Sequence, residues 1–310
     1  MKTSGPVFGL FAALLLTAFP SHAQQPAPAP HATPTPSAVT TDPPADTAHP
    51  ASFVELTVPS HGAKMNGIFY LAAGAGNHPT VVLFHGFPGN EQNLDLAQSI
   101  RRAGWNVLYF HYRGSWGSPG SFTFSNAIAD AQSSIDWLHE KDVAAKYHVD
   151  TSEILIIGHS MGGAIVSYVG AHDPRVAGVV MISAVNLGEM EHAFNNDRAK
   201  IGADMAPDLP PLGGVTADTL IDDVAAHRKE WNDVDYAARL KDRPVLVITS
   251  DDGLAPDGNA FVAALKSAGS TKVSTIHLAT DHSYSGQRIA LQSIILNWTH
   301  DSLPTPPTNP

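Results

Sequence analysis

Residues 154–165 read Ile-Leu-Ile-Ile-Gly-His-Ser-Met-Gly-Gly-Ala-Ile, and this stretch decides how the rest of the chain is interpreted. Its first four residues are a continuous apolar run, which is typical of a strand covered on both faces. The second half continues with the apolar spacing of a helix. Ser160 therefore falls on a sharp turn from strand to helix, with Gly158 and Gly162 permitting close packing around it. A serine on such a turn is typical of an exposed nucleophile, whereas the alternative is a glycine-rich turn with an incidental serine.

A serine hydroxyl is a weak nucleophile and needs a base that a third group orients. His282 follows the strand expected at 273–278, and Asp251 and Asp252 follow the apolar strand expected at 244–248. The carboxyl ends of parallel strands share one edge of a sheet, which is where ligands bind in such folds. The pattern predicts that one of the two aspartates and His282 meet Ser160 at that edge.

The remaining hydrophobic pattern predicts strands alternating with helices. Helical spacing covers residues 91–103, 127–148 and 287–299. Alternation of this kind favours a parallel sheet between two helix layers. The expected strands are 53–58, 65–71, 80–85, 106–110, 153–157, 177–182, 244–248 and 273–278, of which the first two form an antiparallel hairpin.

The order serine, aspartate, histidine resembles that of the α/β-hydrolases, and the resemblance spans about residues 53–300. It rests on the strand-turn-helix around Ser160, on the D-x-x-x-P pattern from Asp252 to Pro256, and on the block Asp-His-Ser-Tyr-Ser at 281–285. The resemblance implies a mostly parallel eight-stranded sheet with a Ser–His–Asp triad. It also favours Asp252 over Asp251 as the acid, because members commonly place that acid directly before a turn toward proline.

The segment Phe84-His-Gly-Phe-Pro-Gly-Asn, residues 84–90, is similar to the H-G-x motif of the same family. The resemblance implies that the backbone N–H groups of Phe87 and Met161 form an oxyanion hole, since acyl transfer needs donors aimed at the developing negative charge. Pro88 has no N–H to donate. His85 is interpreted as a structural residue that holds the loop rather than as a catalytic or metal-binding histidine.

The segment Tyr112-Arg-Gly-Ser-Trp-Gly is similar to the Y-R-G-S-x-G segment of prolyl-oligopeptidase-like hydrolases and their acyl-esterase relatives. In that interpretation Trp116 lines the substrate site and Arg113 ties the loop to neighbouring acids. A glycine-rich turn with a packed tryptophan is the equally weighted alternative.

The two ends of the chain differ from the middle. Residues 1–23 combine Lys2, an apolar run too short to span a bilayer, and small residues at 21 and 23. This pattern predicts a signal peptide cleaved after Ala23 and a periplasmic or secreted protein, and a buried N-terminal helix or uncleaved anchor is the alternative.

Residues 24–50 contain eight prolines and no Phe, Tyr or Trp, so we expect a Pro/Ala/Thr-rich linker. The tail 303–310 has the same composition. The domain is expected over 51–302, interrupted at 187–243 by helical pieces without a strand-like run. Such an insertion is interpreted as a lid over the ligand-binding edge of the sheet, with a surface excursion as the alternative.

Composition excludes several classes of function. The formal charge is −11, from 18 basic and 29 acidic residues, which argues against nucleic-acid binding. The 310-residue chain has no cysteine, and this excludes disulfides, thiolate metal sites and a cysteine nucleophile. The histidines lack ligand spacing, so no metal and no cofactor is expected, and no transmembrane segment is expected in the mature chain.

These expectations combine into one function and two alternatives. The chain is interpreted as an exported serine hydrolase, a carboxylesterase for small or medium acyl esters. The first alternative is an aminopeptidase or dipeptidyl-peptidase of the prolyl-oligopeptidase-like type acting on short peptides, with Glu189 and Glu191 available to hold a free amine. The second alternative is a non-catalytic binding protein that has kept the fold.

Overall fold

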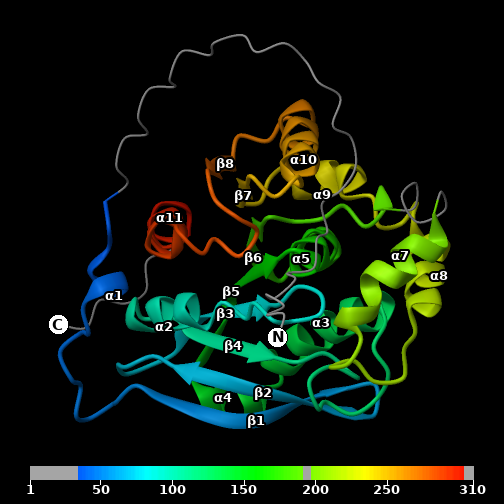
Figure 1. Cartoon of the computed structure of the whole chain (residues 1–310). Coiled ribbons are helices and arrows are strands. Elements are labelled where there is room, and N and C mark those ends of the chain that lie inside the picture. Colours follow the sequence, from blue (N-terminus) through cyan, green and yellow to red (C-terminus); the bar gives the residue numbers. More distant parts are fainter. Residues whose placement is uncertain (1–33, 191–196, 304–310) are drawn as a thin grey trace, which may run out of the picture.

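The computed structural model describes residues 34–190 and 197–303 of the chain. The predicted signal peptide, the tail from residue 304 onward and Glu191 of the insertion lie outside the described residues. Within them, one sheet forms the centre of the molecule and helices cover both of its faces (Figure 1).

The sheet has eight strands in the order β1-β2-β4-β3-β5-β6-β7-β8, and β3 to β8 are parallel to one another. β1 and β2 form the antiparallel hairpin at one edge, and β2 is also antiparallel to β4. The mostly parallel eight-stranded sheet predicted from the sequence is confirmed. The strands are β1 Ser52–Ser60, β2 Ala63–Leu71, β3 His78–Phe84, β4 Asn106–Phe110, β5 Val149–His159, β6 Val176–Ile182, β7 Val245–Ser250 and β8 Val273–Leu278.

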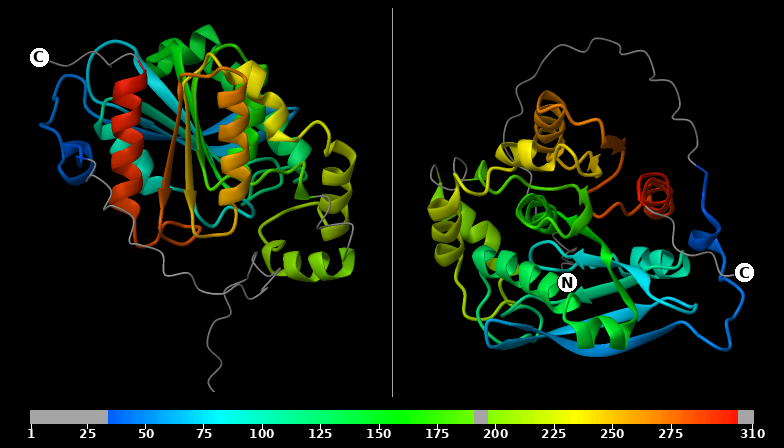
Figure 2. Two further views of the ribbon diagram at one scale, coloured as in Figure 1. Left: turned by 90° about the horizontal axis from the view of Figure 1, so that it is seen from above. Right: turned by 180° about the vertical axis from the view of Figure 1, so that it is seen from behind.

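Two helix layers enclose the sheet because its central strands are apolar on both faces. In β3, Val81 and Leu83 face one layer, whereas Val82 and Phe84 face the other. Helices α2 (Leu94–Arg102) and α11 (Arg288–Ser302) cover the first face. The second face is covered mainly by α3 (Phe124–Leu138), α5 (Met161–His172) and α10 (Ala255–Ser267). Figure 2 shows α10 and α11 on opposite sides of β7 and β8.

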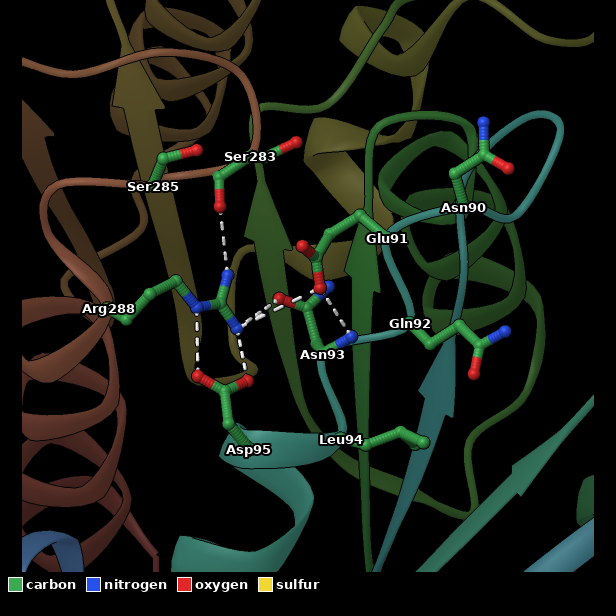
Figure 3. A pocket seen from close by; sticks show the side chains of 9 residues that line it. All are labelled: Asn90, Glu91, Gln92, Asn93, Leu94, Asp95, Ser283, Ser285 and Arg288. Atoms are coloured by element: carbon green, nitrogen blue, oxygen red, sulfur yellow. Dashed lines mark hydrogen bonds and ion pairs between the residues drawn. The ribbon is translucent and has the colours of Figure 1, made fainter.

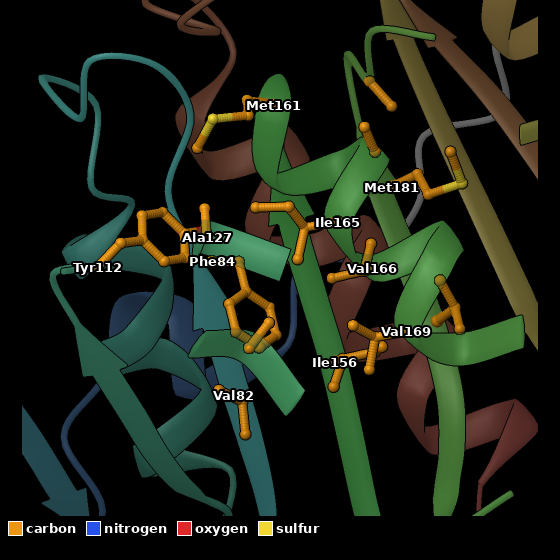
Figure 4. Close-up of a cluster of buried hydrophobic side chains, with 14 of the residues drawn as sticks. Val82, Phe84, Tyr112, Ala127, Ile156, Met161, Ile165, Val166, Val169 and Met181 are labelled. Atoms are coloured by element: carbon orange, nitrogen blue, oxygen red, sulfur yellow. The ribbon is translucent and has the colours of Figure 1, made fainter. Parts of the chain in front are cut away.

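The apolar core beneath α5 fixes the position of the strand-to-helix turn. Ile165, Val166 and Val169 of α5 pack over Ile156 of β5 and its neighbours (Figure 4). All four side chains are buried. Since burying a large aliphatic side chain contributes about 1.5–3 kcal/mol, this contact holds the start of α5 firmly against the end of β5.

One predicted helix is two helices in the structure. Residues 127–148 were expected to be largely helical, but α3 starts earlier, at Phe124, and ends at Leu138, and α4 follows as Lys141–Tyr147. The hydroxyl of Thr123 accepts a hydrogen bond from the Asn126 N–H at 2.9 Å and so caps the start of α3.

Helical pieces follow β6, as the sequence indicates. They are α7 (Arg198–Met205), the 3₁₀ turn η1 (Ala206–Asp208), α8 (Ala217–His227), the 3₁₀ turn η2 (Asp233–Tyr236) and α9 (Ala237–Leu240). The stretch between η1 and α8 is hydrogen-bonded to the loop after β4. Leu212 and Ser115 form an isolated antiparallel β-bridge, and the Gly213 N–H donates to Gly114 O at 2.6 Å.

Part of the proline-rich segment lies against the domain. Its short helix α1 (Ser37–Thr40) rests beside α2 and α11 (Figure 1). Arg102 Nε donates to Ala38 O at 2.6 Å, and Asn297 Nδ2 donates to Pro34 O at 2.7 Å. These bonds attach the described start of the chain to the layer that contains α2 and α11.

Candidate active site

Ser160 stands between β5 and α5 in a backbone conformation that is uncommon for a residue with a side chain. Its φ is 57° and its ψ is −119°. No residue with a side chain fits at the two flanking glycine positions. A Cβ on Gly158 would lie 1.9 Å from Gly162 O, and one on Gly162 would lie 2.2 Å from Phe84 O. The turn therefore exists because the backbone closes on itself at both glycines and carries the serine outward.

His282 and Asp252 form a hydrogen-bonded pair at the same edge of the sheet. His282 Nδ1 lies 2.7 Å from Asp252 Oδ2, and the Asp252 side chain is almost fully buried. A carboxylate accepts, so Nδ1 carries the proton. Nε2 is then the ring nitrogen that remains able to take a proton from another group.

The charge of Asp252 is stabilised by its donors. Burial alone would raise the pKa of Asp252, but hydrogen bonds from His282, from the Leu254 N–H and from Ser183 outweigh it and hold that pKa well below its usual range. The carboxyl group is therefore ionised at neutral pH, as a residue that orients a histidine must be.

Asp251 lies in a different setting from Asp252. Its Oδ1 is 3.1 Å from His277 Nε2 on β8, and 63% of its side chain is exposed. Of the two aspartates that the sequence offered, the structure pairs only Asp252 with His282, so far as the described residues show.

A buried hydroxyl network under Asp252 was not predicted from the sequence. Ser183 Oγ lies 2.8 Å from both Ser250 Oγ and Tyr284 OH. Ser183 and Ser250 follow or end neighbouring strands, β6 and β7, and Tyr284 comes two residues after His282. The position of polar residues at adjacent strand ends was the available signal. Through Ser183 and Tyr284, this hydroxyl network links the Asp252 carboxylate to the loop that carries His282.

His159 joins the serine turn to the histidine loop. Its Nε2 lies 2.8 Å from the backbone oxygen of His282, and the two rings are 4.6 Å apart. Burial, with His282 nearby, lowers the pKa of His159 to about 3, so the ring is neutral and its Nε2 donates to the carbonyl. The bond brings the His282 loop next to Ser160. The described residues show no hydrogen bond between Ser160 Oγ and the His282 ring, a contact that often tightens only when substrate binds.

The loop after β3 passes directly beside the serine. A Cβ on Gly86 would lie 2.8 Å from Ser160 Cβ, so only glycine fits there. Met161 is the first residue of α5 and its N–H has no intrahelical acceptor. In the described part of the chain no group accepts from the Phe87 N–H either. Both donors that the sequence analysis named are therefore available near Ser160.

His85 holds this loop from inside. The ring is 1% exposed, its Nδ1 lies 2.7 Å from Gly86 O, and Tyr112 OH donates to His85 O at 3.1 Å. Burial lowers the pKa of His85 to about 3, so the ring stays neutral. These are the contacts of a residue that supports the loop.

Trp116 connects three loops around the site. Its indole N–H donates to Pro88 O at 2.8 Å, and its backbone N–H donates to Pro211 O at 2.9 Å. The side chain is 38% exposed. Nearby, Arg113 Nε pairs with the buried Asp130 at 2.5 Å, so this loop is tied to an acid as the sequence indicated.

Two negative findings concern the described residues. Among them, no group of three or more His, Cys, Asp or Glu side chains could hold a metal ion. No helix within residues 34–190 and 197–303 is long and apolar enough to cross a membrane.

Comparisons with known proteins agree with this architecture. A sequence model of the alpha/beta hydrolase fold matches residues 79–218, from β3 through the serine turn into α8. The chain has the α/β-hydrolase fold. A carboxyl esterase from Bacillus coagulans has the same fold with a TM-score of 0.62, at 15% identity over 81% of this chain and 99% of the esterase. The acylaminoacyl peptidase of Pyrococcus horikoshii gives 0.61, at 14% identity over 82% of this chain and 42% of the peptidase.

The curated relatives with similar sequences match this chain over only part of its length. An uncharacterized protein of Mycobacterium tuberculosis is 28% identical over 130 residues, which is 42% of this chain and 44% of the relative. A thermostable monoacylglycerol lipase of Bacillus sp. strain H-257 is 25% identical over 198 residues, 59% of this chain and 74% of the lipase. This chain thus spans about half the length of the first curated relatives that it matches.

Proposed function

We propose that this protein is a serine hydrolase that cleaves carboxylic esters with small or medium acyl chains. The observation that carries the proposal is the 2.7 Å bond between His282 Nδ1 and Asp252 Oδ2 next to the Ser160 turn. The names of two similar proteins, a monoacylglycerol lipase and a carboxyl esterase, support ester chemistry.

The proposed mechanism has two acyl-transfer steps. Ser160 Oγ attacks the ester carbonyl while His282 Nε2 takes its proton, and Asp252 stabilises the imidazolium that forms. The N–H groups of Phe87 and Met161 donate to the oxyanion. The alcohol leaves with the proton from His282, and water repeats the sequence on the acyl-enzyme to release the acid.

Trp116 is proposed to line the acyl side of the site. Trp116 is exposed, and it is fixed by its bond to Pro88 O in the loop that supplies the Phe87 N–H. The segment 187–243 is proposed to act as a lid, since residues 211–213 of that segment attach to the Trp116 loop.

The first experiment compares esters with anilides. The purified protein is given 4-nitrophenyl esters from acetate to decanoate, and aminoacyl and dipeptidyl 4-nitroanilides, with Ser160→Ala as the blank. We expect ester turnover that the blank lacks, with its maximum at short or medium chains. Efficient anilide cleavage would replace the proposal by peptidase activity. Glu189, which accepts from Asn232 Nδ2 at 3.5 Å, would then be the first acid to mutate.

We also propose that residues 1–23 direct export to the periplasm or medium and that residues 24–50 link this signal to the domain. The length and flanks of the apolar run support this. N-terminal sequencing of the protein recovered outside the cytoplasm should begin at Gln24. A mature chain that starts at Met1 would contradict cleavage after Ala23.

A further inference from the structure

A surface cavity of about 490 Å³ is lined in part by residues of the loop that carries the proposed catalytic histidine. One wall is the segment 90–95, which continues the loop that carries Phe87. The opposite wall consists of Ser283, Ser285 and Arg288, which follow His282 in the chain (Figure 3). The cavity is therefore built by the continuations of the two loops that carry Phe87 and His282.

The charges in this cavity are largely satisfied by each other. Arg288 forms two hydrogen bonds with the Asp95 carboxylate, one of them at 2.9 Å, and donates to Asn93 Oδ1 at 2.9 Å. Glu91 accepts from the Asn93 N–H at 2.7 Å. A ligand with a net negative charge would find no free cation among these described residues, and Leu94 is their one aliphatic side chain.

Neutral hydrogen-bonding groups make up the rest of the lining. Asn90 and Gln92 contribute primary amides, which both donate and accept, and Ser283 and Ser285 contribute hydroxyls. These groups match a ligand that carries several hydroxyls, because each hydroxyl can donate one hydrogen bond and accept others.

One lining residue has a polar atom without a partner. Asn93 is 1% exposed, and its Nδ2 has no hydrogen-bond acceptor, although its Oδ1 accepts from Arg288. Buried amide nitrogens are normally paired, since leaving one unpaired costs about 1–3 kcal/mol. This unpaired donor belongs to a residue that lines a polar cavity, where an oxygen from outside the chain would satisfy it.

The proposed proton transfer indicates which part of an ester this cavity binds. In the proposed mechanism His282 Nε2 protonates the leaving oxygen, so the alcohol portion lies on the histidine side of Ser160. Ser283 is the next residue after His282. Resting on the proposed esterase function, we infer that the cavity between residues 90–95 and 283–288 binds the alcohol portion of the substrate and that this alcohol is a polyol such as glycerol.

The test uses two esters that differ only in two hydroxyl groups. Glyceryl 1-monobutyrate and propyl butyrate pass through the same butyryl-enzyme, so the ratio of their kcat/KM values reports the alcohol alone. We expect the purified protein to prefer the glyceryl ester by about fivefold or more, the factor that one net hydrogen bond of typical strength gives. The double variant Asn90→Ala with Gln92→Ala should reduce this ratio toward one. In the control Gln98→Ala, which removes an amide of α2 outside the cavity, the ratio should be retained.

The outcomes separate this inference from the proposed function. A wild-type ratio near one, or a ratio that the double variant leaves unchanged, would overturn the polyol site while ester turnover still supports the esterase. Failure to hydrolyse 4-nitrophenyl butyrate as well would overturn the proposed function itself. Loss of the ratio in Gln98→Ala would also overturn the inference, because the preference would then not depend on the cavity.

Discussion

At the scale of single residues, Ser160 is partly buried and has a strained backbone. A positive φ at a residue with a Cβ costs of order 1–3 kcal/mol and persists only where the surroundings impose it. Here the close approach of Gly158 to Gly162 imposes it. The strain aims the hydroxyl away from the sheet, toward the loop that contains Gly86.

Asp252 and Asp251 provide a matched test of the proposed acid. Asp252→Asn removes the carboxylate that accepts from His282 Nδ1 and should lower kcat for 4-nitrophenyl butyrate on the order of 10³–10⁴-fold, since the wrong histidine tautomer results. Asp251→Asn breaks only an exposed pair with His277 and should change kcat by less than about threefold. Equal losses in the two variants would contradict the assignment of Asp252.

Asp233 predicts a pH dependence of stability. Burial, with Asp257 and Glu189 adding repulsion, raises the pKa of Asp233 to about 8, although Asn186 Nδ2 donates to its Oδ1 at 2.9 Å. An unfolded aspartate titrates near 3.9, so between about pH 4 and 8 the native state keeps a proton that the unfolded state has lost. The free energy of unfolding should therefore fall as pH rises through this window.

The variant Asp233→Asn should remove this dependence. Urea unfolding at pH 5, 6, 7 and 8 would show the difference in free energy of unfolding between variant and wild type changing by at most about 1.4 kcal/mol per pH unit in favour of the variant. Asp235→Asn, at an exposed neighbour, serves as the control. Parallel pH profiles for wild type and Asp233→Asn would refute the effect.

At the scale of elements, the eight strands were predictable because each carries apolar residues, in a continuous run or in alternation with polar ones, over a length and between flanks that differ from those of helices. Helix α10 was not predicted, since its start follows the Asp252 turn and its apolar face is narrow. The network of Ser183, Ser250 and Tyr284 was also missed. These residues meet only through strand order, which local patterns do not contain.

The candidate site divides in the same way. Ser160 and His282 carry strong local signals, a strand-to-helix turn and a position just after a strand. The choice of Asp252 over its neighbour needed the family resemblance. The role of His159 in joining the two loops depends on a contact across 123 residues of sequence and could not be predicted from spacing.

The turn between β5 and α5 requires glycine at position 158, and this requirement can be tested. Gly158→Ala would place a methyl group 1.9 Å from a backbone oxygen, and we expect at least about 4 kcal/mol loss in the free energy of unfolding, or no soluble protein. Gly286→Ala has open space around it and should be within about 0.5 kcal/mol of wild type. Chemical denaturation of the two variants measures both. A Gly158→Ala protein of normal stability would mean that the turn relaxes freely.

At the scale of the whole molecule, Asp130 links three parts of the fold. Fully buried on α3, it accepts from Ser60 Oγ of β1 at 2.6 Å and from the Arg113 N–H and Nε in the loop after β4. The carboxylate thus connects the edge hairpin, the helix layer and the loop that carries Trp116.

Removing the Asp130 carboxylate should lower the free energy of unfolding of the whole domain. Asp130→Ala leaves Arg113 with a poorly compensated charge, and we expect a loss of roughly 3–5 kcal/mol in the free energy of unfolding. Asp136→Ala removes an exposed partner of Arg175 on the same helix and should cost under about 1 kcal/mol. Thermal and urea unfolding would rank the two, and a ranking in the opposite order would show that the buried pair is dispensable.

The order of the strands along the chain also determines when each part of the candidate site is synthesised. The ribosome releases the Ser160 turn and its core strands β3, β5 and β6 well before β7 and β8, which add Asp252 and His282 at one side of the sheet. A growing chain therefore holds its proposed nucleophile without a base until the last strand pairs. Helix α11 then closes over the sheet, where Gln292 Nε2 and Arg288 reach Asp95 of α2. Under the proposed mechanism, a nascent chain arrested or clipped before β8 and His282 would therefore be inert.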